Sequence, residues 1–261
     1  MNTLVFDIET VPDTDYGRQL LELPPQLPDA DVASAMFALR RERTGDDFLP
    51  LPQHRVVAIA CALRRGDSLT VWSLGDPQSD ERELLERFFE GIERYTPELV
   101  SWNGGGFDLP VLHYRCLKHG IQAARYWEHG DQDSAFRYNN YLSRYHWRHI
   151  DLMDVLSSYS ARARASLSDM ATFLGLPGKL GFSGAQVWDA WQKGERVAVR
   201  RYCETDVLNT WLVFLAFERM RGNLTAEAQQ REWQRVRELL AASGEPHHAE
   251  FLAKWLQTPP R

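Results

Sequence analysis

The sequence predicts an α/β fold: a three-layer domain with a mixed sheet. Three observations predict it: short apolar runs typical of strands in the first half, helical periodicity through most of the second half, and helices connecting some of the strands. With 261 residues, of which 44% are hydrophobic and 25% are charged, the chain fits one large domain or one domain with an appendage.

The first expected strand places two acids together. We interpret Glu9-Thr10-Val11-Pro12 as the end of this strand, so Asp7 and Glu9 should lie at its carboxyl end. Side chains alternate between the two faces of a strand, and the period of two puts both carboxylates on the same face. The expected strands are Thr3 to Ile8, Arg55 to Leu63, Asp67 to Ser73 and Glu98 to Trp102, with a hairpin through Arg65-Gly66-Asp67.

Apolar periodicity, capping residues and breakers predict the helices. Pro97 ends the helix expected over Asp80 to Tyr95, and Gly120 ends the helix that begins at Asp108. The expected helices are Asp31 to Arg43, Asp80 to Tyr95, Asp108 to His119, one after the capping box Ser166-Leu-Ser-Asp169, Ala185 to Lys193, Arg196 to Met220, and two between Thr225 and Trp255 that break at Ser243-Gly244-Glu245-Pro246. We therefore expect a domain over residues 1–222 and a helical C-terminal extension over residues 223–261. The Pro-rich insertion from Pro24 to Pro52 has no assigned role.

The net charge and the cysteine content exclude some classes of protein. Thirty basic and 36 acidic residues give a net charge of −6, which argues against binding nucleic acid through a global positive field. A polyanionic substrate would then be held locally or through metal. The three cysteines are widely spaced, which predicts neither a disulfide framework nor a CxxC metal pair. This cysteine usage predicts a reducing, cytoplasmic setting. No export signal and no apolar run of the ~20 residues needed to span a bilayer is apparent.

Asp7-Ile8-Glu9 is the first candidate motif. Its spacing arises easily by chance, and a solvated strand end is the alternative explanation. However, two acids that point the same way after a buried apolar run cost desolvation and repel each other unless cations neutralise them. Oxygen ligands of this kind favour Mg²⁺ or Mn²⁺.

Two further segments carry candidate side chains. Asn103-Gly-Gly-Gly-Phe107-Asp108 joins an expected strand to a helix; its glycines would let a nucleic-acid backbone approach, and Phe107 offers a flat surface to a terminal base. The alternative is a turn in which Asp108 caps the helix. Tyr202 and Asp206 are one helical turn apart on the same face. The alternative there is a tyrosine anchored in the core beside a solvated aspartate.

Taken together, these segments resemble the three exonuclease motifs of the DEDD superfamily in its DEDDy branch. They are similar to the proofreading 3′–5′ exonuclease domain of family B DNA polymerases, here as a stand-alone protein. The resemblance spans roughly residues 3–215. The DEDDh branch would need a histidine five residues before Asp206, where Arg201 stands. The resemblance implies a ribonuclease-H-like fold with a mixed five-stranded sheet flanked by helices.

The resemblance also implies an activity and a set of site residues. It implies a 3′–5′ exonuclease that hydrolyses single-stranded DNA or RNA to nucleoside monophosphates with two divalent cations, Mg²⁺ or Mn²⁺. Asp7 would bridge the two ions, Glu9 and Asp206 would complete one ion site, and Asp108 would serve the other. Tyr202 would orient the attacking water. The residues expected to contact substrate are Thr10, Asn103 and Phe107.

Other functions remain open at this point. One is a nucleic-acid-binding or polymerase-partner module with a vestigial hydrolytic site, docking on a polymerase or repair partner through its C-terminal helices; the intact carboxylates count against it. Another is an enzyme that cuts internally or trims a structured RNA. A preference for DNA or RNA is not encoded in any motif.

Three secondary features each have two interpretations. The range Arg125 to His149 interleaves arginines with aromatic residues, which suits either a stacking surface or a core-packing hairpin. Asp151 is either a fifth acid near the metals or, more simply, a helix cap. A set of basic residues would either guide the strand or form a charged solvent face: Arg162, Arg164, Lys179, Arg200 and Arg201.

Overall fold

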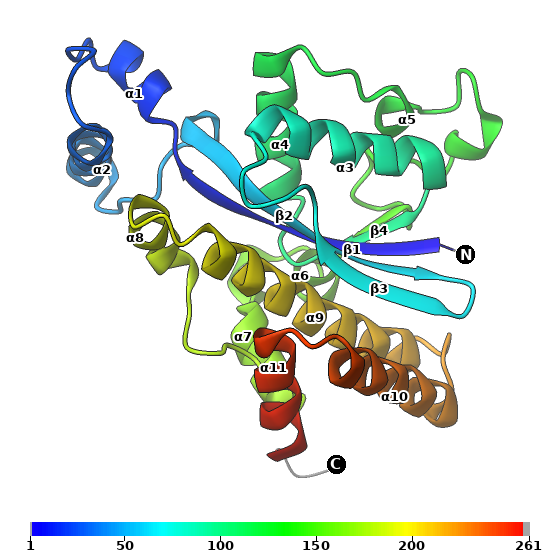
Figure 1. The fold of residues 1–261 in the computed structure, drawn as a ribbon. Helices are drawn as coiled ribbons and strands as arrows, with labels where there is room; N and C mark the ends of the chain where they lie inside the picture. The colour runs from blue at the N-terminus through cyan, green and yellow to red at the C-terminus, as the bar shows by residue number, and fades with distance from the viewer. Residues whose placement is uncertain (1, 258–261) are drawn as a thin grey trace.

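A computed structural model describes residues 2–257, and its centre is a mixed five-stranded sheet (Figure 1). The strand order is β3-β2-β1-β4-β5. β1 pairs antiparallel with β2 and parallel with β4, and β5 continues the parallel part. The strands are β1 (Asn2–Pro12), β2 (His54–Arg65), β3 (Ser68–Ser73), β4 (Glu98–Ser101) and β5 (His149–Asp151). The predicted fold class, a ribonuclease-H-like domain with a mixed five-stranded sheet and flanking helices, is confirmed.

The predicted end of the first strand, at Ile8 with Glu9-Thr10-Val11-Pro12 as its terminator, is wrong. β1 runs on to Pro12, because β2 continues to pair with it as far as His54. The register shifts between Glu9 and Thr10, where β2 contributes the extra residue Val57 of a β-bulge. Pairing with β4 ends earlier, at Val5. Asp7 and Glu9 therefore lie just past the parallel part of β1 and not at its end.

Alternating side chains of β1 build a core on each side of the sheet. Leu4 and Phe6 pack into one core with α3 and α4, whereas Val5 packs into the other with α9. Figure 1 shows α3 and α4 on one side of the sheet and α9 on the other. The helices of these layers are α3 (Glu81–Tyr95), α4 (Asp108–His119) and α9 (Arg196–Met220). Asp7 and Glu9 lie two and four residues after Val5 in the strand, so their side chains are on the same face as that of Val5 and face α9.

Local capping signals explain why these helices lie close to their predicted ranges. Asp80 accepts a hydrogen bond from the backbone N–H of Glu83 and so caps α3. Gly120 ends α4 in the left-handed region, at φ 64°. The shorter helices are α5 (Ala124–Trp127), α6 (Leu152–Leu156), α7 (Leu167–Phe173) and α8 (Val187–Gln192), with 3-10 turns at Leu51–Gln53, Ser134–Phe136, Ala161–Ala163 and Gly184–Gln186.

The insertion between β1 and β2 forms a small subdomain beside the end of β1 (Figure 1). It contains α1 (Thr14–Leu20) and α2 (Asp29–Thr44) around a core of Val32, Met36 and Leu49. The sequence predicted α2 but not α1. Gly17 allows the two helices to approach, since a Cβ there would lie 2.3 Å from the sulfur of Met36.

The residues after Thr225 form the two predicted helices, α10 (Ala226–Ala242) and α11 (Pro246–Gln257). α10 contacts α9 and β3, and α11 contacts α9 and α10. Arg64 of β2 forms an ion pair with Glu232 of α10, with N···O 2.8 Å. Residues 258–261 of the expected extension lie outside the described residues. A role of these helices in docking a partner stays a prediction. Among residues 2–257, no helix is both long enough and apolar enough to cross a bilayer.

The arginine- and aromatic-rich range folds as α5, a 3-10 turn and loops, so the hairpin in one of its two interpretations is wrong. Its core-packing alternative holds for Tyr126, Phe136 and Tyr141, which are buried. The guanidinium of Arg148 stacks 3.9 Å from the ring centroid of Phe136. The exposed aromatic side chains of this range are Trp127, Tyr138, Tyr145 and Trp147.

Candidate functional site: an acidic cluster between β1, α4 and α9

Asp7 and Glu9 lie together on the α9 side of β1, as predicted. One carboxylate oxygen of each lies within 4.8 Å of the other and of the sulfur of Cys203. The Cys203 thiol donates to Asp7 Oδ2 at 3.4 Å. Glu9 is buried, whereas Asp7 is partly exposed.

Asp108 reaches the same cluster from the other side of β1. It is the first residue of α4, and its Oδ1 accepts a hydrogen bond of 3.1 Å from the backbone N–H of Ile8. Ile8 lies between Asp7 and Glu9. The alternative in which Asp108 caps its own helix is wrong, because Phe107 takes the N-cap position and no side chain caps this helix.

Tyr202 and Asp206 come from α9 and share one face of the helix, as their spacing predicts. Their side chains are joined by a hydrogen bond, and both are partly exposed. The charge of Asp206 acts on both carboxylates of β1, and these two carboxylates in turn act on Tyr202. The five predicted catalytic residues therefore converge from three elements that are far apart in the sequence.

Burial and mutual repulsion raise the pKa values of the carboxylates in this cluster. Burial, followed by the charges of Asp108 and Asp206, raises the pKa of Asp7 well above its usual value. The pKa of Glu9 is raised in the same way, by burial and then by the charge of Asp7. Burial raises the pKa of Asp108 to about 7 and that of Asp206 to about 6. Clustered, mutually repelling carboxylate oxygens are the donor set that fits Mg²⁺ or Mn²⁺.

The glycine turn before α4 is anchored to Asp151. Asn103 adopts a left-handed conformation, with φ 63°, and its backbone N–H donates to Asp151 at 3.0 Å. The backbone N–H of Gly105 donates to the other oxygen of this carboxylate at 2.9 Å. Asp151 also caps α6, so the predicted capping role is confirmed. Gly104 is required because a Cβ there would lie 2.2 Å from the hydroxyl of Ser101.

A cleft of about 880 Å³ opens beside Glu9. Two of the three predicted substrate contacts, Thr10 and Phe107, line it, whereas Asn103 is not among its lining residues. Opposite walls come from α2 and from α8 with the turn before it. Phe48 and His54 complete an aromatic cluster with Phe107, with ring centroids 5.2–5.6 Å apart.

Sequence reasoning missed three residues of this region. Cys203 lies inside the Tyr-x-x-x-Asp motif, but nothing local indicated that its thiol points at Asp7. His54 accepts or donates a hydrogen bond of 2.8 Å with the Thr10 hydroxyl, and Phe48 follows an acidic loop. The sequence marked the Pro-rich insertion only as a whole, as a segment between the first two strands, and did not indicate which of its residues line the site.

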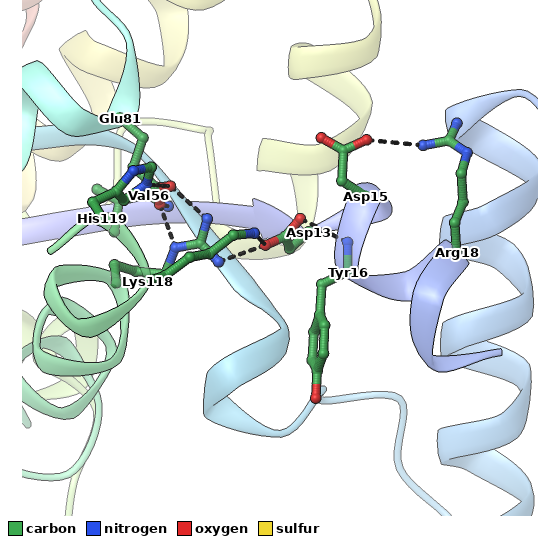
Figure 2. A network of polar contacts seen from close by, with 9 residues as sticks. Asp13, Asp15, Tyr16, Arg18, Val56, Glu81, Lys118 and His119 are labelled. Carbon is green, nitrogen blue, oxygen red and sulfur yellow. Dashed lines mark hydrogen bonds and ion pairs between the residues drawn. The ribbon is translucent and has the colours of Figure 1, made fainter. Parts of the chain in front are cut away.

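A buried ion-pair network fixes α4 relative to the sheet (Figure 2). Arg115 of α4 contacts Asp13, which follows β1, at 2.5 Å and Glu81 of α3 at 2.5 Å. Lys118 also pairs with Asp13, and the backbone N–H of Val56 donates to Glu81. Burial alone would raise the pKa of Asp13, but hydrogen bonds from Lys118 and Arg115 hold it below its usual value. The network thereby holds the helix that carries Asp108.

The basic residues near the site have different roles. The positive charge of Lys179 acts on Asp206 and opposes the rise of its pKa. Arg200 donates instead to backbone carbonyls at the end of β3, and Arg201 pairs with Glu245 at 3.3 Å. Arg164 pairs with Asp154 at 2.8 Å. Within residues 2–257, Lys179 is thus the member of this set whose charge is shown to act on the acidic cluster.

A mixed sheet with carboxylates converging from β1, α4 and α9 defines a protein of the ribonuclease-H-like class. The chain belongs to the family described as "Predicted 3'-5' exonuclease related to the exonuclease domain of PolB", whose model matches residues 46–255. The matched residues include Asp108, Tyr202 and Asp206 and begin after Asp7 and Glu9.

DNA polymerases are among the similar proteins. The chain is 26% identical over 137 residues to a DNA polymerase of Archaeoglobus fulgidus, covering 51% of this chain and 17% of that polymerase. It is 32% identical over 84 residues to a DNA polymerase of Pyrococcus glycovorans, covering 30% of this chain and 10% of that polymerase. A solved family B DNA polymerase from Pyrobaculum calidifontis aligns with a TM-score of 0.48 and 16% identity, over 97% of this chain and 27% of that one. The chain thus spans only a small part of the length of these relatives.

Proposed function

We propose that the chain hydrolyses single-stranded nucleic acid stepwise from its 3′ end, releases nucleoside monophosphates and requires two divalent cations, Mg²⁺ or Mn²⁺. One observation carries the proposal: Asp7, Glu9, Asp108, Tyr202 and Asp206 converge in a single electrostatically coupled cluster beside an open cleft. Membership in the exonuclease-related family supports it.

The four carboxylates would hold the ions. When bound, two divalent cations supply an activated water and neutralise charge on the leaving oxygen of an in-line displacement. The charges of Asp108 and Asp206 act on both Asp7 and Glu9, so the four carboxylates form one cluster. The hydrogen bond from Ile8 orients Asp108, and the Cys203 thiol orients Asp7. These contacts keep the ligand oxygens in place before the ions bind.

Tyr202 would act as a hydrogen-bond donor. Burial, and then the charges of Asp206 and Glu9, raise the pKa of its phenol, so the hydroxyl keeps its proton at neutral pH. A protonated phenol can orient a water molecule but is a poor proton acceptor. Its present contact with Asp206 places this hydroxyl next to a proposed metal ligand.

The cleft would hold the 3′-terminal nucleotides. Phe107 and Phe48 offer ring faces for stacking on bases, which is tolerant of sequence. Thr10 would donate or accept a hydrogen bond from the cleft wall, and Asn103 would contact the strand from the turn before α4. The cleft volume of about 880 Å³ is of the size that takes a small ligand or a few groups of a flexible strand.

The test is degradation of matched 3′- and 5′-labelled DNA and RNA single strands with Mg²⁺, Mn²⁺ or a chelator. We expect stepwise loss from the 3′ end that requires metal and disappears in Asp7→Asn. A circular single strand should resist, because an exonuclease needs an end. Cleavage of the circle would indicate internal cutting instead. Binding of single strands without cleavage under any metal condition would indicate the vestigial, partner-binding module.

A further inference from the structure

A second cluster of metal-ligating side chains lies where α11 meets α9, apart from the carboxylates described above. Glu204 of α9 and His247 and His248 of α11 each offer one ligand atom within 4.8 Å of the others. His247 and His248 are buried, with 8% and 3% of their surface exposed. Figure 1 shows the start of α11 beside α9.

The hydrogen bonds of His248 leave one ring nitrogen unpaired. Ser243 Oγ donates to the carbonyl of Leu240 at 3.1 Å, so it must accept the hydrogen bond of 2.9 Å from His248 Nδ1. In the neutral ring the single proton is therefore on Nδ1, and Nε2 carries a lone pair.

That lone pair faces a carboxylate. His248 Nε2 lies 3.6 Å from Glu204 Oε2 and, within residues 2–257, has no hydrogen-bond partner. The other oxygen, Glu204 Oε1, accepts from the Ser73 hydroxyl at 2.6 Å. Two acceptors thus face each other in a buried position, which costs free energy unless a cation lies between them.

His247 can supply the third ligand through its other tautomer. Its Nε2 lies 2.7 Å from Glu204 Oε2, while its buried Nδ1 has no partner among the described residues. Glu245 Oε2 lies 3.9 Å from that Nδ1. Moving the ring proton from Nε2 to Nδ1 frees Nε2 for an ion and turns the proton toward Glu245. A single cation would thereby bind the unpaired Nε2 of His248 together with the freed Nε2 of His247, while the Nδ1 proton of His247 would face Glu245.

We propose that Glu204, His247 and His248 form a zinc site that fastens α11 to α9. Two imidazole nitrogens and one carboxylate oxygen are donors that Zn²⁺ prefers, in contrast to the all-oxygen set that suits Mg²⁺. Zinc ligands about 2.0–2.2 Å from the ion in a tetrahedron are about 3.4 Å apart. The 3.6 Å between Glu204 and His248 already fits, and His247, at 2.7 Å from Glu204, needs to retreat by about 0.7 Å.

Two contacts complete the site. Ser243 and Ser73 hold His248 and Glu204 in their ligand orientations, as outer partners of zinc ligands commonly do. A hollow of about 460 Å³ between His247 and Tyr202 offers an entry path and room for water as the fourth ligand. Because Ser73 ends β3, the ion would link the C-terminal helix to both α9 and the sheet.

The test is a calorimetric titration of chelator-stripped full chain with Zn²⁺. The background is Asp7→Asn/Asp108→Asn, which removes two charges from the acidic cluster so that ions bound there do not obscure the result. We expect one Zn²⁺ per chain, and binding at least about 100-fold weaker in His248→Gln and Glu204→Gln. His129→Gln, an exposed loop histidine, is the matched control and should bind Zn²⁺ as the background does.

Two readouts do not depend on the variants or on nuclease activity. Co²⁺ added to the same background should show the visible absorption of a four-coordinate ion. Zn²⁺ at a hundredfold excess over its Kd should raise the unfolding temperature by roughly 5 °C or more. A background protein that binds no Zn²⁺, or binding that survives in His248→Gln, would overturn the zinc site and leave a packing contact between helices.

Discussion

The backbone N–H of Ile8 donates a hydrogen bond of 3.1 Å to Oδ1 of Asp108, 100 residues further along the chain. Ile8 separates Asp7 from Glu9, so this bond ties the carboxylate of α4 to the strand segment that carries the other two. These three carboxylates are therefore positioned mainly by the backbone of β1. Tyr202 and Asp206 depend instead on the placement of α9.

Replacing Asp7 should separate catalysis from folding. Asp7→Asn removes a charge from a buried cluster of like charges, so we expect loss of detectable nuclease activity without loss of stability. The unfolding temperature at pH 7.5 in chelator should equal or exceed that of the parent. The exposed Asp131→Asn is the matched control and should retain activity. An Asp7→Asn protein that does not fold would assign the side chain a structural role.

The stability of the metal-free protein should report the titration of Asp108. Its pKa in the folded protein is about 7, above the value of about 4 in an unfolded chain, so the folded state holds more protons between these pH values. The contribution of Asp108 to stability is therefore present at low pH and is lost as pH rises through about 7.

Asp108→Asn removes this titration together with the charge that raises the pKa of Asp7, and Asn can still accept the Ile8 hydrogen bond. Buried histidines such as His149, whose pKa is lowered to about 4, titrate in the opposite sense and contribute equally to both proteins. We expect the stability of the variant relative to the parent to increase between pH 5 and pH 7.5 in chelator. Mn²⁺ should remove most of that difference. Parallel pH profiles of the two proteins would contradict the raised pKa.

Tyr202→Phe should slow the chemical step. The loss of one positioning hydrogen bond predicts a fall in kcat of ~10²-fold, with KM for the strand changed much less. Tyr138→Phe, in an exposed tyrosine, should leave both constants unchanged. Steady-state kinetics with a 3′-labelled oligonucleotide measures the effect. An unchanged kcat would remove Tyr202 from the mechanism.

Phe48 tests whether the insertion takes part in substrate binding. Phe48→Ala removes a ring that packs 5.6 Å from Phe107 on the cleft wall, and we expect KM to rise about tenfold. Phe48→Leu keeps apolar bulk but not the flat ring and should show most of the same effect. If Phe48→Leu binds as the parent does, apolar contact rather than stacking is what this wall supplies.

Arg115 tests the buried network that holds α4. Arg115→Met leaves Asp13 and Glu81 buried with less compensating charge, and we expect a loss of about 3–5 kcal/mol in the free energy of unfolding. Arg87→Met, at an exposed helical ion pair with Glu83, should cost about 0.5 kcal/mol or less. Urea denaturation followed by circular dichroism compares the two. Equal effects would mean that the network adds little.

The sequence predicted the parts of the site that local patterns encode. Helix periodicity and caps gave α4 and α9 nearly to the residue, and period-two alternation put Asp7 and Glu9 on one face. Prediction from the sequence failed where contacts with a segment distant in the sequence determine the structure. β1 extends to Pro12 because β2 continues to pair with it, and the thiol of Cys203 meets Asp7 only after α9 packs on the sheet.

The role of the insertion could not be predicted from the sequence for the same reason, although its helix α2 was predicted. Its helices bury few residues of their own, and the cleft wall they form exists only opposite Phe107 and α8. Glu204 likewise had no signal, since its histidine neighbours follow it by more than 40 residues.

Neighbouring residues of α9 contact different parts of the molecule. Tyr202 and Asp206 face the acidic cluster, Cys203 contacts Asp7, and Glu204 contacts the start of α11. An inserted or deleted residue between Arg200 and Asp206 would rotate one part of the helix by about 100° relative to the other. The side chains that make these contacts would then no longer be aligned with all of their partners. This stretch should therefore tolerate single substitutions far better than any change in length, which a deletion scan across residues 196–220 would reveal as a sharp local minimum in folded yield.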